Sequence, residues 1–124
     1  DYAAEANLQT FIKVSIEDPQ GLAAVPEIAK IPGIDVITFG TGDLANSMGF
    51  PGQRHHPTVI AEVDRAMALV RKAGKQSGIP TFGPEDLAES HRRGARFMAL
   101  QLTQVIAKGA ASWKIGPGAR NFAK

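Results

Sequence analysis

The stretch Ile34-Asp35-Val36-Ile37-Thr38-Phe39-Gly40-Thr41-Gly42-Asp43 decides the fold class of this 124-residue chain. Its first six residues are rich in β-branched and apolar side chains, which is typical of a strand, and a glycine-rich turn follows directly. A helical pattern comes next, because apolar side chains recur at helical spacing between residues 58 and 73. The order strand, turn, helix predicts one βα unit.

The same order recurs along the rest of the chain. Further strands are predicted over residues 11–17, 79–82 and 95–102, and helices over residues 21–30, 44–48, 58–73, 85–93 and 104–113. Asp18 suits an N-cap with Pro19 at the first helical position, the helix that follows is expected to begin or kink at Pro26, and Gly74 is expected to end the helix over residues 58–73. Alternating strands and helices give a parallel sheet, since each crossover helix returns the chain to the same end. The strand ends are about 28 residues apart, against roughly 31 per unit in a (β/α)₈ barrel. This α/β chain therefore has about half the length of such a barrel, although an open doubly wound sheet has similar spacing.

The composition excludes several classes of function. The chain contains no Cys, which excludes a disulfide scaffold, a structural zinc ribbon and a Cys nucleophile. Its 14 Lys and Arg and 12 Asp and Glu are interspersed, which argues against a nucleic-acid partner. No apolar run is long enough to span a membrane, so no membrane partner is expected. A cytoplasmic location is expected, but a chain that begins with Asp1 would not show an N-terminal signal.

Two carboxylates follow two successive predicted strands. Glu17 ends the first strand, and Asp43 follows the second after a short turn. Ligands of parallel α/β folds bind at the carboxyl ends of strands, and Mg²⁺ or Mn²⁺ binds carboxylate oxygens together with substrate oxygens and water. The pair is therefore a candidate site for a divalent metal that polarises a carbonyl group. The alternative is that both residues are helix N-caps or solvated loop acids.

The glycine turn allows a second interpretation. Gly40, Gly42 and Ala45 match the dinucleotide-binding pattern G-x-G-x-x-G/A. The acid that this pattern requires about 20 residues later falls near Glu62, inside a predicted helix, so nicotinamide binding is the less favoured alternative. The turn glycines also expose backbone N–H groups near Asp43, and such a nest can hold a carboxylate or a phosphate.

Two adjacent histidines, His55 and His56, precede Pro57 at the start of the longest predicted helix. Neighbouring residues point in different directions, so the pair is poorly placed to bind one metal ion. A role as a helix cap or loop residue is favoured.

Several separated strings of the sequence stand out: they are Val14-Ser15-Ile16-Glu17, Ile31-Pro32-Gly33-Ile34-Asp35, Phe39-Gly40-Thr41-Gly42-Asp43-Leu44, Met48-Gly49 and His56-Pro57. In this order, they resemble the HpcH/HpaI aldolase family. The string Gly78-Ile79-Pro80-Thr81-Phe82-Gly83 is similar to the macrophomate synthase branch of that family. The family consists of metal-dependent class II pyruvate aldolases, among them 2,4-dihydroxyhept-2-ene-1,7-dioate aldolase. Their fold is a (β/α)₈ TIM barrel of the phosphoenolpyruvate/pyruvate-domain type. The resemblance implies that residues 1–124 are the C-terminal half of one such barrel domain, with the N-terminal half absent from this chain.

The resemblance also implies a chemistry for the strand ends. It implies a carbon–carbon lyase that acts through a pyruvate enolate, with oxaloacetate decarboxylation as a related reaction. Glu17 and Asp43 correspond to the residues that bind the divalent metal, which is Mg²⁺, Mn²⁺ or Co²⁺. The implied substrate is pyruvate or an oxaloacetate-like 2-keto acid. The implied substrate-binding residues are Asp43, Gly42 through its backbone N–H, Ser15 in place of the usual Gln, Thr41 in place of the usual Pro, and Gly40.

The family's catalytic His and Arg belong to the first half of the barrel. The resemblance therefore implies that no catalytic residue lies in these 124 residues and that this part alone is inactive. The implied partners are the remaining half of the barrel and further copies in a homo-oligomer, a trimer or a hexamer. The alternative function is a catalytically silent half-barrel that serves binding or assembly.

Overall fold

The computed structural model describes residues 1–111. Four strands form one parallel sheet in which the spatial order follows the sequence. Ser15 pairs with Thr38, Thr38 with Gly78, and Gly78 with Phe97. The predicted α/β class and the predicted parallel sheet are confirmed. The strands are β1 (Lys13–Ile16), β2 (Val36–Phe39), β3 (Gln76–Thr81) and β4 (Phe97–Leu100).

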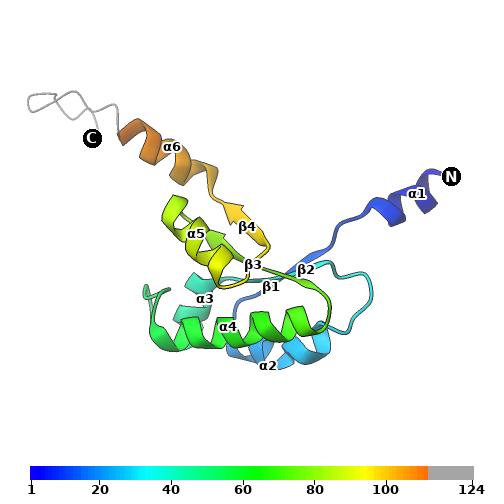
Figure 1. Ribbon diagram of the computed structural model, residues 1–124, viewed down its shortest axis with the longest axis horizontal. Helices are drawn as coiled ribbons and strands as arrows, with labels where there is room; N and C mark the ends of the chain where they lie inside the picture. The colour runs from blue at the N-terminus through cyan, green and yellow to red at the C-terminus, as the bar shows by residue number, and fades with distance from the viewer. Residues whose placement is uncertain (112–124) are drawn as a thin grey trace, which may run out of the picture.

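Helices α2 and α4 pack against each other beneath one face of the sheet, whereas α1 and α6 extend away from it (Figure 1). Within residues 1–111, no helix is both long enough and apolar enough to cross a membrane. The predicted end of the last helix, Trp113, lies outside the described residues. The helices are α1 (Tyr2–Gln9), α2 (Pro19–Ile28), α3 (Thr41–Ser47), α4 (Pro57–Lys72), α5 (Pro84–Arg92) and α6 (Leu102–Ala111).

Helix α2 begins at a capping residue that the sequence predicts. The Asp18 carboxylate accepts a hydrogen bond from the Gly21 N–H at 2.6 Å, and Pro19 occupies the first helical position. Pro26 lies inside the helix and does not end it, because α2 continues to Ile28. The sequence predicts that this helix begins or kinks at Pro26. A beginning at Pro26 is wrong, because α2 begins at Pro19.

Helix α4 also begins and ends at residues with a clear local role. His56 is its N-cap and accepts a hydrogen bond at Nδ1 from the Thr58 N–H at 3.3 Å, so the predicted capping role is confirmed. Gly74 follows the helix with a φ of +79°, a left-handed conformation that glycine adopts without a steric penalty.

The hydrophobic core lies between the sheet and helices α2 and α4. Ile37 and Phe39 of β2 are fully buried, and the helices contribute Val25, Val63 and Met67 to the same cluster. Successive side chains of a strand point to opposite faces of the sheet. The exposed residues Lys13 and Ser15 of β1 therefore alternate with the residues that pack on the core.

Some predicted boundaries are wrong for physical reasons. Strand β3 begins at Gln76 rather than Ile79, because pairing with β2 overrides the low strand propensity of Gln76, Ser77 and Gly78. Residues 40–43 are not an independent turn, since helix α3 begins at Thr41 directly after β2. Helix α1 was not predicted from the sequence, because its apolar residues form no stripe on one face; its two large apolar side chains, Tyr2 and Leu8, are exposed.

Candidate metal and substrate site

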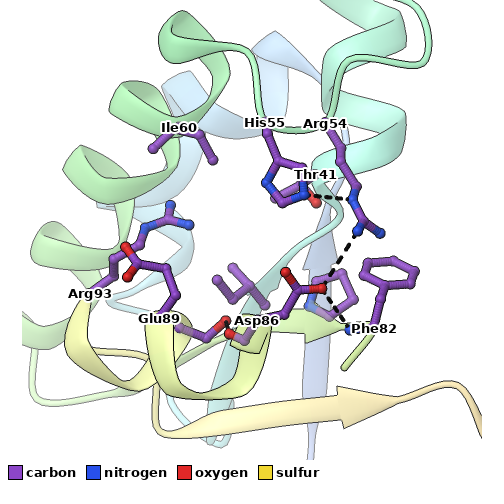
Figure 2. Close-up of a pocket in the computed structure, with 11 residues that line it drawn as sticks. Thr41, Arg54, His55, Ile60, Phe82, Asp86, Glu89 and Arg93 are labelled. Carbon is purple, nitrogen blue, oxygen red and sulfur yellow. Dashed lines mark hydrogen bonds and ion pairs between the residues drawn. The ribbon is translucent and has the colours of Figure 1, made fainter. Parts of the chain in front are cut away.

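A pocket of about 330 Å³ lies at the ends of the strands, and residues singled out in the sequence line it. These residues are Ser15, Glu17, Gly40, Gly42 and Asp43. Thr41 is not among the lining residues. Its side chain is buried and faces a smaller cavity of about 40 Å³ on the side of α4 and α5, which Figure 2 shows. The fold therefore brings together all but one of the residues predicted for the site.

Glu17 follows β1 directly, and a neighbouring hydroxyl group holds its carboxylate. Ser15 Oγ donates a hydrogen bond to Glu17 Oε1 at 2.9 Å. The two side chains can meet because residues two apart on an extended chain point to the same side. Ser47 of α3 donates a hydrogen bond to the backbone carbonyl of Glu17 at 3.3 Å. Glu17 is thus linked to its own strand and to the helix that carries Asp43.

Gly40 provides the space that the Glu17 side chain occupies. A Cβ atom at position 40 would lie 2.9 Å from Glu17 Cγ and 3.2 Å from Oε1. The Gly40 N–H also donates a hydrogen bond to the Ile16 carbonyl at 2.9 Å, which holds the ends of β1 and β2 together. The φ of Gly40 is −77°, so the requirement for glycine is one of space and not of backbone conformation.

Asp43 lies in the first turn of α3, where a negative charge interacts favourably with the helix dipole. It is not the N-cap of that helix, because the cap is Gly40 and makes no side-chain hydrogen bond. Glu17 is likewise not the cap of α2, since Asp18 has that role. The cap half of that alternative is therefore wrong for both residues, whereas both are exposed, which agrees with its other half, solvated acids.

The donor atoms of the pocket fit a hard divalent cation. Among residues 1–111, no group of three or more His, Asp or Glu side chains is placed to hold a metal ion by itself. Two carboxylates suit Mg²⁺ or Mn²⁺ when substrate oxygens and water complete the coordination. The Glu17 carboxylate is already oriented for such a role by the Ser15 hydroxyl and by the space at Gly40.

The residues of the competing hypotheses lie elsewhere. His56 stacks on Phe50 with ring centroids 3.7 Å apart, and His55 Nε2 accepts a hydrogen bond from Arg54. Glu62 lies within α4 and pairs with Arg65, so it does not occupy the strand end where a dinucleotide-binding fold requires an acid.

The sequence prediction missed several residues that line the pocket, namely Lys13, Thr38, Phe39, Ile79, Pro80, Phe82, Ala99 and Gln101. The rule that identified Glu17 applies to two of them. Phe82 follows β3 directly, and Gln101 follows β4. Lys13 could have been found from strand alternation, because it lies on the same side of β1 as Ser15.

Comparisons with known proteins identify relatives of the chain. The model of the HpcH/HpaI aldolase/citrate lyase family matches residues 3–108. Hydroxypyruvate/pyruvate aldolase from Sagittula stellata is 35% identical over 111 residues, which cover 90% of this chain and 44% of that protein. The 4-hydroxy-2-oxovalerate aldolase from Rhodococcus jostii is 40% identical over 109 residues, covering 86% of this chain and 42% of that protein. The chain thus spans less than half the length of these relatives.

Solved structures show the same relationship. A HpcH/HpaI aldolase/citrate lyase family protein from Burkholderia cenocepacia superimposes with a TM-score of 0.85 and 28% identity, over 90% of this chain and 44% of that one. Macrophomate synthase matches with a TM-score of 0.72 and 21% identity, which shows a shared fold. The four-stranded sheet therefore corresponds to part of the barrel of these proteins, as the sequence predicts. The chain belongs to the HpcH/HpaI aldolase/citrate lyase family.

Proposed function

We propose that this chain is the C-terminal half of a divalent-metal-dependent class II aldolase, a carbon–carbon lyase that acts on pyruvate-type 2-keto acids. One observation carries the proposal. Glu17 and Asp43 follow neighbouring parallel strands and line one pocket together with Gly40 and Gly42. The names of the relatives, a hydroxypyruvate/pyruvate aldolase and a 4-hydroxy-2-oxovalerate aldolase, support the same class of reaction.

Glu17 and Asp43 are the residues that would hold Mg²⁺, Mn²⁺ or Co²⁺. When bound, the cation polarises the keto group of the substrate and stabilises the negative charge of the enolate. Ser15 fixes the Glu17 carboxylate through its hydrogen bond. Gly40 has no side chain, so it does not collide with that carboxylate. A preformed arrangement of this kind avoids the cost of reorganising the site when the substrate binds.

The start of α3 would receive the carboxylate group of the 2-keto acid. A Cβ atom built on Gly42 would have no atom within 4 Å, so the backbone of Gly42 can be approached closely. The N–H groups at the first turn of a helix have no partner within the helix and attract anions. Thr41 would contribute through its backbone, because its buried side chain faces away from this pocket.

In aldol cleavage, the hydroxyl group of the substrate loses a proton, the C–C bond breaks, and its electron pair forms the enolate. We assign the groups that move these protons to the remaining half of the barrel, outside residues 1–124. The proposed active form is therefore the complete barrel, assembled as a homo-oligomer, a trimer or a hexamer. Oxaloacetate decarboxylation would use the same enolate and lose carbon dioxide instead of an aldehyde.

Exchange of the pyruvate methyl protons in D₂O tests the proposal, because this exchange reports the enolate directly. The full-length protein with Mn²⁺ or Mg²⁺ is expected to catalyse exchange, and EDTA is expected to stop it. Asp43→Asn should lower the exchange rate by about 100-fold or more, since it removes a charged ligand. Glu62→Gln is the matched control, because Glu62 pairs with Arg65 on α4 and does not line the pocket. Equal exchange by wild type and Asp43→Asn would contradict the proposal.

A further inference from the structure

Phe82, the residue that follows β3, is held from three directions. Its N–H donates a hydrogen bond to Asp86 Oδ2 at 3.1 Å, and its carbonyl accepts one from the Lys108 ammonium group of α6. The Arg54 guanidinium carbon lies 3.7 Å from the centroid of the ring, which is the geometry of a cation–π contact (Figure 2). Both the backbone and the ring of Phe82 are therefore fixed.

Arg54 and Asp86 form an ion pair that joins two separate segments around Phe82. Arg54 belongs to the loop before α4, whereas Asp86 lies in the first turn of α5, and their side chains are 3.5 Å apart. About 30% of each side chain is exposed, at 31% and 29%. Asp86 Oδ2 serves both the Arg54 guanidinium and the Phe82 N–H, as the dashed lines in Figure 2 show. One carboxylate thus links the loop, the strand end and α5.

The Phe82 side chain lines the candidate site as well as the space behind it. It lines the pocket that contains Glu17 and Asp43, and it also lines the smaller cavity near Arg54. Glu17 and Asp43 follow β1 and β2, whereas Phe82 follows β3, the next strand of the sheet. Neighbouring strands are about 4.8 Å apart, so the ring borders the space next to the carboxylates.

We propose that Phe82 determines which acceptor aldehyde the enzyme uses, and that Arg54 and Asp86 are positioning residues that hold its ring. The inference rests on the proposed function. In the condensation direction, enolate C3 forms a bond to the aldehyde carbon, and the carbonyl electron pair moves to the aldehyde oxygen, which takes a proton. The substituent of the aldehyde then lies against the Phe82 ring. A fixed ring leaves room for a small substituent and excludes a bulky one.

The test is the ratio of kcat/KM for benzaldehyde to kcat/KM for acetaldehyde, measured with pyruvate and Mn²⁺ on the full-length protein. Phe82→Ala is expected to raise this ratio about tenfold or more, because pocket volume is the property that distinguishes the two aldehydes. Phe82→Leu should shift it in the same direction by less, and it serves as the second variant where Phe82→Ala does not fold. A ratio that neither variant changes would overturn the inference.

The positioning role is tested with a matched pair of arginine variants. Arg54→Met removes the charge above the ring and should raise the ratio, whereas Arg54→Lys keeps a cation there and should raise it less. Arg65→Met is the control, because Arg65 pairs with Glu62 on α4 and lines neither cavity. The same ratio in Arg54→Met and wild type, or an equal shift in Arg65→Met, would overturn the positioning role.

Methyl proton exchange of pyruvate without aldehyde separates this inference from the proposed function. If the wild-type protein catalyses exchange and the Phe82 variants keep the wild-type aldehyde ratio, only the acceptor role is overturned. A wild-type protein that catalyses no exchange overturns the proposed function, and the acceptor role with it.

Discussion

Glu17 lies directly over Gly40, so close that a Cβ atom at position 40 would be 2.9 Å from Glu17 Cγ. This contact joins the ends of β1 and β2 at the candidate metal site, where the Gly40 N–H also bonds the Ile16 carbonyl. The absence of one side chain therefore fixes where a carboxylate on the neighbouring strand can lie.

Gly40→Ala should weaken metal binding at little cost in the free energy of unfolding. The atoms that a new Cβ would meet belong to the flexible Glu17 side chain, which can move at little cost in stability. The carboxylate would then leave its position beside Ser15. We expect the Kd for Mn²⁺ to rise about tenfold, as for other changes in the support of a metal ligand. Titration of Mn²⁺ followed by electron paramagnetic resonance measures this.

Gly42→Ala is the matched control for that experiment, because a Cβ atom at position 42 would have no atom within 4 Å. Its Kd for Mn²⁺ should stay within about twofold of the wild-type value, since the backbone and both carboxylates are unchanged. An equal loss of affinity in the two variants would show that the space at Gly40 has no particular role.

Ser15→Ala tests the hydrogen bond to the Glu17 carboxylate. The bond is 2.9 Å long and exposed, so its net contribution is about 1 kcal/mol. Its loss should therefore raise the Kd for Mn²⁺ about fivefold. Ser47→Ala removes a bond to the backbone carbonyl of Glu17 instead and should have a smaller effect. Isothermal titration of both variants would contradict the assignment if Ser47→Ala were the more damaging change.

Gly78→Ala should destabilise the sheet strongly. A Cβ atom at position 78 would lie 2.3 Å from the backbone oxygen of Phe97, and a backbone atom in a paired strand cannot move aside easily. We expect a loss of about 3 kcal/mol in the free energy of unfolding, at the upper end of the range for overpacking. Urea denaturation of the full-length protein measures it. An unfolding midpoint equal to that of wild type would show that β3 and β4 are farther apart.

Asp64→Asn should cost more stability than loss of an exposed ion pair. Arg93 is 14% exposed and donates to Asp64 Oδ1 at 2.8 Å, while its Nη2 atom has no hydrogen-bond partner among the described residues. Because Asp64 itself is 43% exposed, we expect a loss of about 1–2 kcal/mol, less than for a fully buried pair.

The control for Asp64→Asn is Glu89→Gln, which removes the exposed pair with Arg92. We expect a change below about 0.5 kcal/mol in this variant. Thermal unfolding compares the two. Equal destabilisation would mean that the partial burial of Arg93 adds nothing to its ion pair.

The sequence predicts the alternation of strands and helices well, because hydrophobic periodicity and the Gly and Pro residues between segments are local signals. Asp18, Pro19 and Gly74 mark helix ends correctly for the same reason. The start of β3 could not be predicted, since Gln76 and Ser77 become a strand only through pairing with Val36 and Ile37 of β2. Tertiary contacts override propensity there.

The candidate site, too, could be predicted from the sequence only in part. Glu17 and Asp43 could be placed together from the sequence, because the carboxyl ends of adjacent parallel strands meet at one edge of a sheet. The place of Thr41 could not, since its side chain direction depends on α3 beginning at that residue. The contacts of Phe82 could not be predicted either, because they come from Arg54 and Lys108, which are distant in sequence.

The sequential strand order also has a consequence for how the chain folds. Each strand pairs with the next one along the chain, so the sheet can grow by adding one strand at a time in the order of synthesis. The entropy lost in closing a loop rises with its length. The longest loop between paired strand positions runs from Thr38 to Gly78 and contains α3 and α4. Docking of β3 on β2 is therefore the pairing with the highest entropic cost, and formation of α4 within that loop shortens the segment that must be closed.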